Sequence, residues 1–97
     1  DPLLNAALEE LLNTIQTDEF AFLSLRDLAW DSRLGLVART PNADARIVLG
    51  YEEFQTRFDK WHRFYRDVIL IKGMDPFRSI DLRFEGNVIT KETPHES

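Results

Sequence analysis

The chain has 97 residues, 43% of them hydrophobic, with 12 Lys and Arg, 17 Asp and Glu, and no Cys. This composition predicts one soluble domain and excludes intrinsic disorder, disulfide frameworks and Cys-based zinc sites. The net charge of −5 disfavours duplex nucleic acid as a partner, because such binding requires clustered cations. No apolar run in these residues is long enough for a membrane span.

The first predicted element is an amphipathic helix over 3–16. Asp1-Pro2 is typical of a helix start, because Asp accepts bonds from first-turn amides and Pro needs no donor there. Apolar residues then recur at helical spacing on one side: Leu4, Leu8, Leu11, Leu12 and Ile15. Residues 17–19 carry no apolar period and end the helix.

Three strands are predicted between residues 20 and 49. From Phe20 to Trp30 the apolar residues nearly alternate, and their phase changes near Arg26, which predicts a bulge or a break there. Short strands follow at 34–39 and 46–49, each after a turn rich in Asp, Asn, Ser or Pro.

A second, longer helix is predicted after Gly50. Its aromatic and aliphatic residues follow steps of three and four and form a narrow stripe: Phe54, Phe58, Trp61, Tyr65 and Val68. This spacing indicates a core-facing stripe rather than a cofactor site. The basic residues of the helix step around its back among acids, which is typical of a solvated face.

A C-terminal hairpin is predicted next. Strict alternation gives a half-buried strand with Ile80, Leu82 and Phe84 on one side. Gly86-Asn87 is a two-residue hairpin signal, and the last strand covers about 88–91. Such a loop sets three pairs opposite each other: Phe84 and Ile89, Arg83 and Thr90, and Glu85 and Val88.

Together these elements predict an α+β fold in which a mostly antiparallel sheet of about five strands is covered by two helices. If the third and fourth strands are neighbours, the helix between them makes that one pair parallel. Residues 1–91 form a single domain, and residues 92–97 are predicted to be a disordered tail.

Groups that carry catalysis, cofactors or metals are sparse. The sequence has no glycine-rich phosphate loop, no G-x-S-x-G and no H-E-x-x-H. His62 lies beside the apolar stripe and is interpreted as a packing residue, and His95 as a solvated tail residue. Glu9-Glu10 and Glu52-Glu53 are interpreted as surface charge. We expect no catalytic residue, cofactor or metal; a small enzyme that uses His62 is the weaker alternative.

The last strand has little chain after it to cover its outer backbone. An uncovered edge accepts a strand from another chain, although shortness, Lys91 and the tail are an alternative that protects it. Three to five backbone bonds at ~0.5–1.5 kcal/mol each fall short of the ~8 kcal/mol of a micromolar complex. Side-chain anchors must supply the rest, and Phe84, Val88 and Tyr65 are candidates.

Three segments carry a family resemblance. They are the strand Ile47-Val48-Leu49-Gly50, the helix with Phe54, Phe58, Trp61, Phe64 and Tyr65, and Ser79-Ile80-Asp81-Leu82-Arg83-Phe84 followed by a Gly turn and Val88-Ile89. In this order they resemble the C-terminal part of the bacterial division proteins FtsQ/DivIB, over about residues 8–91.

The resemblance implies a non-enzymatic interaction domain of a divisome scaffold in septum assembly. It places the domain on the extracytoplasmic, periplasmic side of the bacterial inner membrane, anchored by an upstream transmembrane helix and preceded by a POTRA domain. The implied partners are FtsB/DivIC-like and FtsL-like division proteins, which add a strand to the C-terminal edge. The family's contact positions match Phe84, Glu85, Gly86, Asn87, Val88, Ile89 and Thr90. Another envelope α+β module that binds ligands or peptides, such as a POTRA-like domain, is the alternative.

Overall fold

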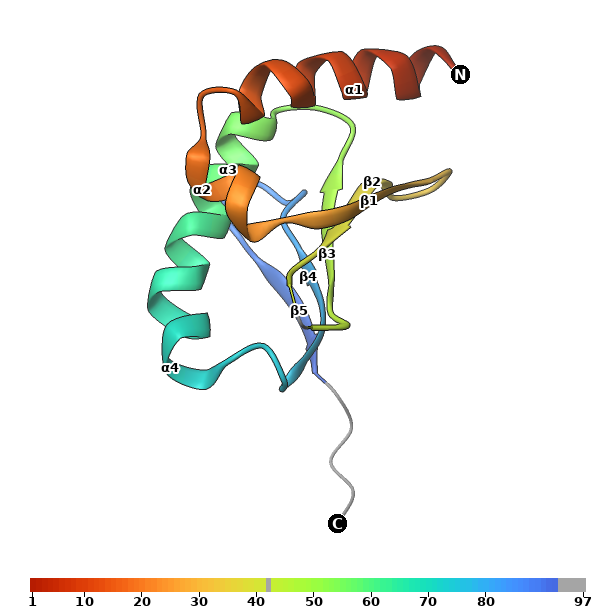
Figure 1. Cartoon of the computed structure of the whole chain (residues 1–97). Helices are drawn as coiled ribbons and strands as arrows, with labels where there is room; N and C mark the ends of the chain where they lie inside the picture. Colours follow the sequence, from red (N-terminus) through yellow and green to blue (C-terminus); the bar gives the residue numbers. More distant parts are fainter. Residues whose placement is uncertain (42, 93–97) are drawn as a thin grey trace.

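The computed structural model describes residues 1–41 and 43–92, arranged as an α+β fold (Figure 1). In chain order the elements are α1 (Pro2–Ile15), α2 (Glu19–Ser24), β1 (Arg26–Asp31), β2 (Gly35–Arg39), β3 (Arg46–Gly50), α3 (Phe54–Phe64), the π-helical turn η1 (Tyr65–Ile69), α4 (Leu70–Lys72), β4 (Phe77–Asp81) and β5 (Ile89–Glu92).

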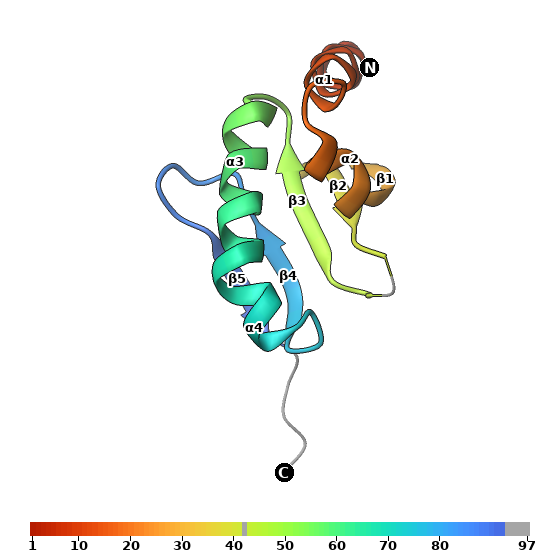
Figure 2. The same cartoon turned by 60° about the vertical axis from the view of Figure 1, so that its left-hand side comes forward.

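The five strands form one sheet in the order β1-β2-β3-β4-β5. All neighbours are antiparallel except β3 and β4, which are parallel and are joined through α3, η1 and α4. The predicted mostly antiparallel sheet is therefore confirmed, and β3 and β4 are the neighbours on which the expected parallel pair depended. Figures 1 and 2 show α2 and the α3–α4 segment on one face of the sheet, with α1 across one end.

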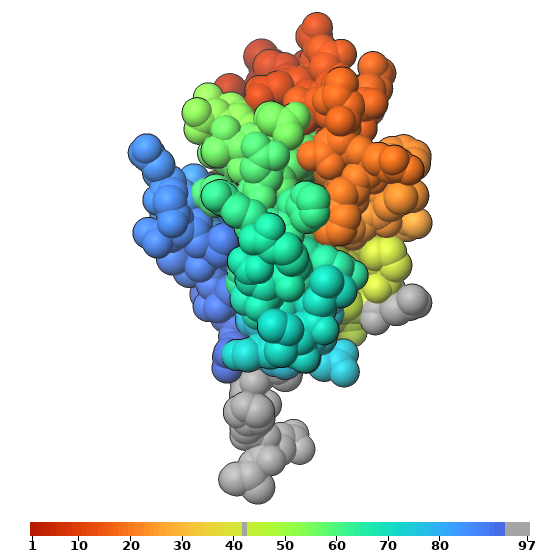
Figure 3. Space-filling view, turned by 90° about the vertical axis from the view of Figure 1, so that its left-hand side faces the viewer, coloured from red at the N-terminus to blue at the C-terminus, as the bar shows by residue number. Residues whose placement is uncertain are grey.

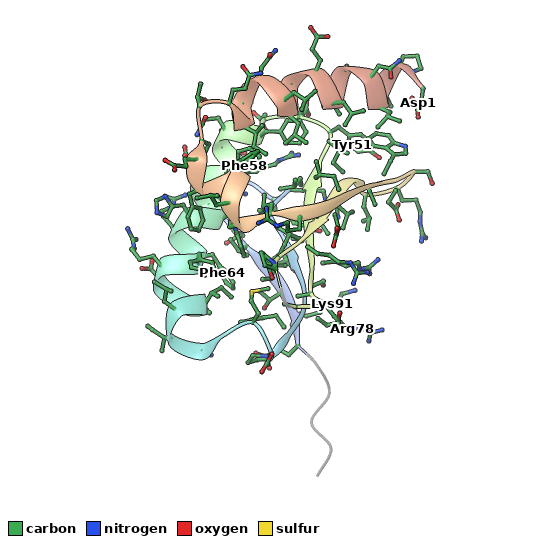
Figure 4. All side chains as sticks on the ribbon, in the orientation of Figure 1. Asp1, Tyr51, Phe58, Phe64, Arg78 and Lys91 are labelled. Carbon is green, nitrogen blue, oxygen red and sulfur yellow. The ribbon has the colours of Figure 1, made fainter. Side chains whose placement is uncertain are left out.

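The aromatic stripe of α3 forms the centre of the core. Phe54, Phe58 and Trp61 are at most 1% exposed, and they pack with Ile47 of β3 and Ile80 of β4, both fully buried. In Figure 4 the labelled stripe residue Phe58 lies on the side of the helix that is turned toward the sheet. Each such side chain contributes roughly 1.5–3 kcal/mol by leaving water, so this stripe is a main source of stability.

The predicted stripe does not continue unchanged to its end. At Tyr65 the α-helix passes into the π-helical turn η1, which rotates the following residues relative to the α-helical period. Tyr65 and Val68 are only half-buried, and Leu70 and Ile71 are 68% and 79% exposed. The core contact therefore weakens in the last turns of the helical segment.

The strand predicted from Phe20 onward is wrong in its first half, because residues 19–24 form helix α2. The Asp18 carboxylate caps this helix by accepting a 3.0 Å bond from the Ala21 amide, and Trp61 Nε1 donates to Ser24 Oγ at 2.9 Å. The predicted break near Arg26 is confirmed, since the pairing with β2 shifts register between Arg26 and Ala29.

The two-residue hairpin at Gly86-Asn87 is also wrong. Strand β4 ends at Asp81, and the chain forms a longer loop over 82–88 before β5 begins. The observed pairs are Phe77 with Glu92, Ser79 with Lys91, Ile80 with Thr90 and Asp81 with Ile89. Ile89 thus pairs with Asp81, which precedes its predicted partner Phe84 by three residues. Glu92 belongs to β5, and the rest of the predicted tail, 93–97 with His95, lies outside the described residues.

Gly35 allows β2 to approach β3 closely. Gly35 has φ +83°, and a Cβ atom on it would lie 2.5 Å from the carbonyl carbon of Gly50. Gly86, in the 82–88 loop, has φ +72° with open space around it. Gly35 and Gly86 thus share a positive φ that disfavours side chains, but only Gly35 lies against a neighbouring strand.

We therefore expect Gly35→Ala to lower the free energy of unfolding by about 2–5 kcal/mol, since left-handed strain and a backbone clash add. Gly86→Ala carries only the strain and should lower it by about 1–2 kcal/mol. Urea unfolding of both variants measures the difference. Equal losses would show that the close approach of Gly35 to Gly50 contributes nothing.

Candidate protein-binding edge

Strand β5 forms one edge of the sheet. It pairs with β4 on one side, and no strand among residues 1–41 and 43–92 pairs with its other side. In an antiparallel strand, alternate residues direct their N–H and C=O groups to opposite edges. About half of the backbone groups of Ile89–Glu92 therefore point outward, where an added strand would bond to them.

The residues matched to the family's contact positions fall on two structural elements. Ile89 and Thr90 lie in β5, whereas residues 84–88 lie in the loop before it. Within that loop the Asn87 amide donates to the Phe84 carbonyl at 3.3 Å, which closes a turn with Gly86 in its centre. The loop and the edge strand together form the candidate site.

Lys60 of α3 holds this loop through hydrogen bonds to its backbone. Lys60 is 7% exposed, and its Nζ donates to the carbonyls of Phe84 and Asn87, the second at 3.3 Å. Burial lowers the pKa of Lys60, and the neighbouring Arg57 guanidinium lowers it further. Sequence reasoning missed this role, because a lysine beside an apolar stripe looks like part of the solvated face.

A groove of about 330 Å³ separates the helical segment from the loop. Its walls are formed by Lys60, Arg63, Phe64, Asp67 and Val68 on one side and by Gly86, Asn87 and Val88 on the other. Figure 3 shows the loop and β5, in blue, lying along the helical segment, in teal. The groove thus combines apolar side chains with exposed Arg63 and Asp67, while the Lys60 ammonium at its base is bonded to the loop.

The start of the loop is fixed by an ion pair between Asp81 and Arg83. Arg83 Nη2 and Nε donate to the two carboxylate oxygens at 2.7 Å and 2.9–3.1 Å, and the Arg83 amide donates to the same carboxylate at 3.0 Å. The Asp81 carboxylate raises the pKa of Arg83. The Arg83 guanidinium carbon lies 5.5 Å from the centre of the Phe84 ring, which is itself 47% exposed.

Three other residues singled out from the sequence lie away from this edge. The ring of Tyr65 contacts Phe20 and Trp61, at centroid distances of 5.1 and 5.6 Å, on the α2 side of the helix. His62 is exposed and stacks on Phe20 at 4.6 Å. Glu10, interpreted as surface charge, instead accepts a 3.3 Å bond from the Phe54 amide at the start of α3. The structure therefore does not bring Tyr65 to the edge.

A protein-family model described as FtsQ/DivIB, C-terminal related, matches residues 4–91. The chain belongs to this family. No curated protein matches it. The expected FtsQ/DivIB relationship is thereby confirmed, and with it a link to cell division. The family is typically extracytoplasmic. Among residues 1–41 and 43–92, no helix combines the length and hydropathy needed to cross a bilayer.

The anchoring role of Lys60 in this FtsQ/DivIB-related domain can be tested with Lys60→Met. We expect faster hydrogen exchange at the Asn87 amide, because the 84–87 turn loses two bonds from Nζ. Arg63→Met is the matched control, because Arg63 is exposed and lies about one helical turn from Lys60. It should leave the exchange of the Asn87 amide unaltered. Identical protection in all three proteins would contradict the anchor.

The same pair of proteins gives a pH prediction. Because the pKa of Lys60 is lower in the folded state than its ordinary 10.5, the unfolded chain binds more protons between those two values. The stability of the wild type relative to Lys60→Met should therefore rise as the pH rises through that window. Urea unfolding of both proteins at neutral and alkaline pH measures the trend, and a fall would contradict it.

Proposed function

We propose that this domain is a non-enzymatic interaction module of a division scaffold that binds an extended partner segment along the outer edge of β5. The position of β5 at the end of the sheet order carries the proposal. The partners we propose are FtsB/DivIC-like and FtsL-like division proteins, on the periplasmic side of the inner membrane during septum assembly. Membership of the FtsQ/DivIB-related family supports this choice.

Strand addition alone gives limited affinity at this edge. Four residues of β5 present few outward backbone groups, and each bond contributes ~0.5–1.5 kcal/mol. A micromolar complex needs ~8 kcal/mol, so side chains must contribute most of the affinity. Phe84 and Ile89, which are 47% and 46% exposed, and the groove beside Val88 are the anchors we propose.

The remaining environment supports a binding role rather than catalysis. His62, the residue of the enzyme alternative, is stacked on Phe20 and lies on an exposed side of α3. Lys60 is buried and directs its Nζ to two backbone carbonyls, as an anchor of structure does. We therefore propose a role in which shape and edge hydrogen bonds, not a reacting group, determine activity.

The edge mechanism is tested by a pair of proline variants, Thr90→Pro and Lys91→Pro. Adjacent residues of a strand point their N–H groups to opposite edges, so one variant removes a bond to β4 and the other removes an outward donor. The variant that loses the bond to β4 should be less stable by about 1–3 kcal/mol. The variant that loses the outward donor should keep its melting temperature and bind an FtsB/DivIC-like periplasmic segment about tenfold or more weakly.

Melting curves identify which variant is which, and calorimetric titration of the partner segment measures binding. The thermally unchanged variant is the informative one, because its fold is intact. If it binds the segment as tightly as the wild type, strand addition at β5 is excluded, and the family assignment is unaffected.

The side-chain anchor is tested with Phe84→Ala. We expect the affinity for the partner segment to fall by about 1–2 kcal/mol, with little change in stability, because the ring is half exposed. Phe22→Ala is the matched control, since Phe22 of α2 is 58% exposed and lies away from β5. Equal effects of the two substitutions on binding would remove Phe84 from the interface.

A further inference from the structure

The sheet face that carries no helix has a distinctive charge pattern. On β2 and β3 the core residues Leu36, Ala38, Ile47 and Leu49 alternate with residues outside the core cluster, Val37, Arg39, Arg46 and Val48, so the latter lie on the helix-free face. One residue of each strand is aligned across this face by direct pairing: Arg26, Arg39, Arg46, Ser79 and Lys91.

Four of these five residues are cations, and we call Arg26, Arg39, Arg46 and Lys91 the basic row. All four are exposed. Neighbouring strands lie ~4.8 Å apart, so the row crosses the sheet over roughly 19 Å. Figure 4 shows Lys91 and the nearby Arg78 on the side of the sheet opposite the helices. Like charges placed directly opposite each other destabilise a sheet, so this arrangement opposes folding.

Nearby acids neutralise the basic row only weakly. Within residues 1–41 and 43–92 its one ion pair joins Arg39 to Asp44 at 3.9 Å, and the Asp44 side chain is fully exposed. Asp31, on which Arg46 acts at longer range, already accepts the amides of Arg33 and Leu34. Asp81 is held by Arg83 at 2.7 Å. Asp27 lies near Arg39 and Arg46 without an ion pair to either, so the cations of the row are only partly balanced in a chain of net charge −5.

A small recess lies beside the middle of the basic row. It measures about 160 Å³, and Arg39 and Arg46 line it together with Ala29, Trp30 and Val37, as well as Asp27 and Asp31. Its size suits one aliphatic side chain placed between charged neighbours.

We propose that the basic row binds an acidic polypeptide segment that places carboxylates on either side of an aliphatic residue. Acidic side chains of a bound segment recur about every 5–6 Å along one side of a helix, or about every 6.7 Å along one side of a strand. These distances are close to the ~4.8 Å between neighbouring strands of the sheet, and long Arg side chains can make up the difference. Arg binds carboxylates through two parallel hydrogen bonds. Charge complementarity and the recess support this occupant.

A polypeptide fits this face better than an anionic membrane. The basic row is one residue wide, and Asp27, Asp31 and Asp44 lie beside it. A flat anionic surface would bring its charges against these carboxylates as well as the cations, whereas a narrow chain can follow the row and place only an uncharged aliphatic side chain beside Asp27 and Asp31. Except for the Lys91 side chain, this binding does not use the outer edge of β5, and it does not depend on the function proposed for that edge.

The test uses the 97-residue chain and two peptides, Glu-Glu-Leu-Glu-Glu and its neutral match Gln-Gln-Leu-Gln-Gln, followed by fluorescence anisotropy. The acidic peptide should bind, the neutral one should not, and added salt should weaken binding. Arg39→Gln/Arg46→Gln should bind it roughly 3- to 30-fold more weakly, with melting temperature unchanged or raised. Arg39→Lys/Arg46→Lys should bind it with intermediate affinity, because Lys keeps the charge but cannot make the two parallel hydrogen bonds.

The matched control is Arg66→Gln/Lys72→Gln, which removes the same charge from exposed residues of the helical segment that do not line the groove beside Val88. It should bind the acidic peptide as the wild type does. The proposal is overturned if the acidic peptide does not bind, if the control loses as much affinity as the double Gln variant, or if the chain binds only vesicles that contain phosphatidylglycerol.

Discussion

The contact between the aromatic stripe of α3 and strands β3 and β4 is the interaction on which the rest of the structure depends. Three nearly inaccessible rings, Phe54, Phe58 and Trp61, bridge two strands that share only a short parallel pairing. Parallel pairs need a crossover segment to bring them together, and burial of the stripe makes that crossover stable. Once β4 is held beside β3, β5 can pair only on its far side and becomes the edge.

The same helix also shapes the candidate binding edge. Its apolar side forms part of the core. Lys60, the residue before Trp61, donates hydrogen bonds to the carbonyls of Phe84 and Asn87. Glu10 of α1 accepts a bond from the first amide of α3 and so fixes the helix start. Core packing and the conformation of the 82–88 loop are therefore coupled through one element, and a change in the helix position would move the loop with it.

Helices cover only one face of the sheet, and this asymmetry separates two kinds of surface. The helix-covered face contains the core, while the helix-free face presents the basic row and the Asp81–Arg83 pair. The edge of β5 lies between the two faces. A single arrangement of strands thus places a backbone-mediated surface beside a charge-mediated one, and the two differ in their expected response to salt.

Sequence reasoning failed where short patterns are ambiguous. Residues 20–24 satisfy alternation and helical spacing equally well, and the capping bond of Asp18 to Ala21 decides for a helix. The Gly86-Asn87 signal predicts a tight hairpin, but the bonds of Asp81 to Arg83 end β4 early and Lys60 holds the longer loop. Both outcomes depend on hydrogen bonds made by individual polar side chains, which the apolar pattern does not encode.

The amino-acid sequence by itself determined the α+β class, the two long helical segments and the family, because apolar period and order along the chain encode them. Only the tertiary structure decided the register of β5, the anchoring role of Lys60 and the alignment of the basic row. The reason is physical: strand register and cross-strand neighbours are set by bonds between segments far apart in the chain, which no local window of sequence contains.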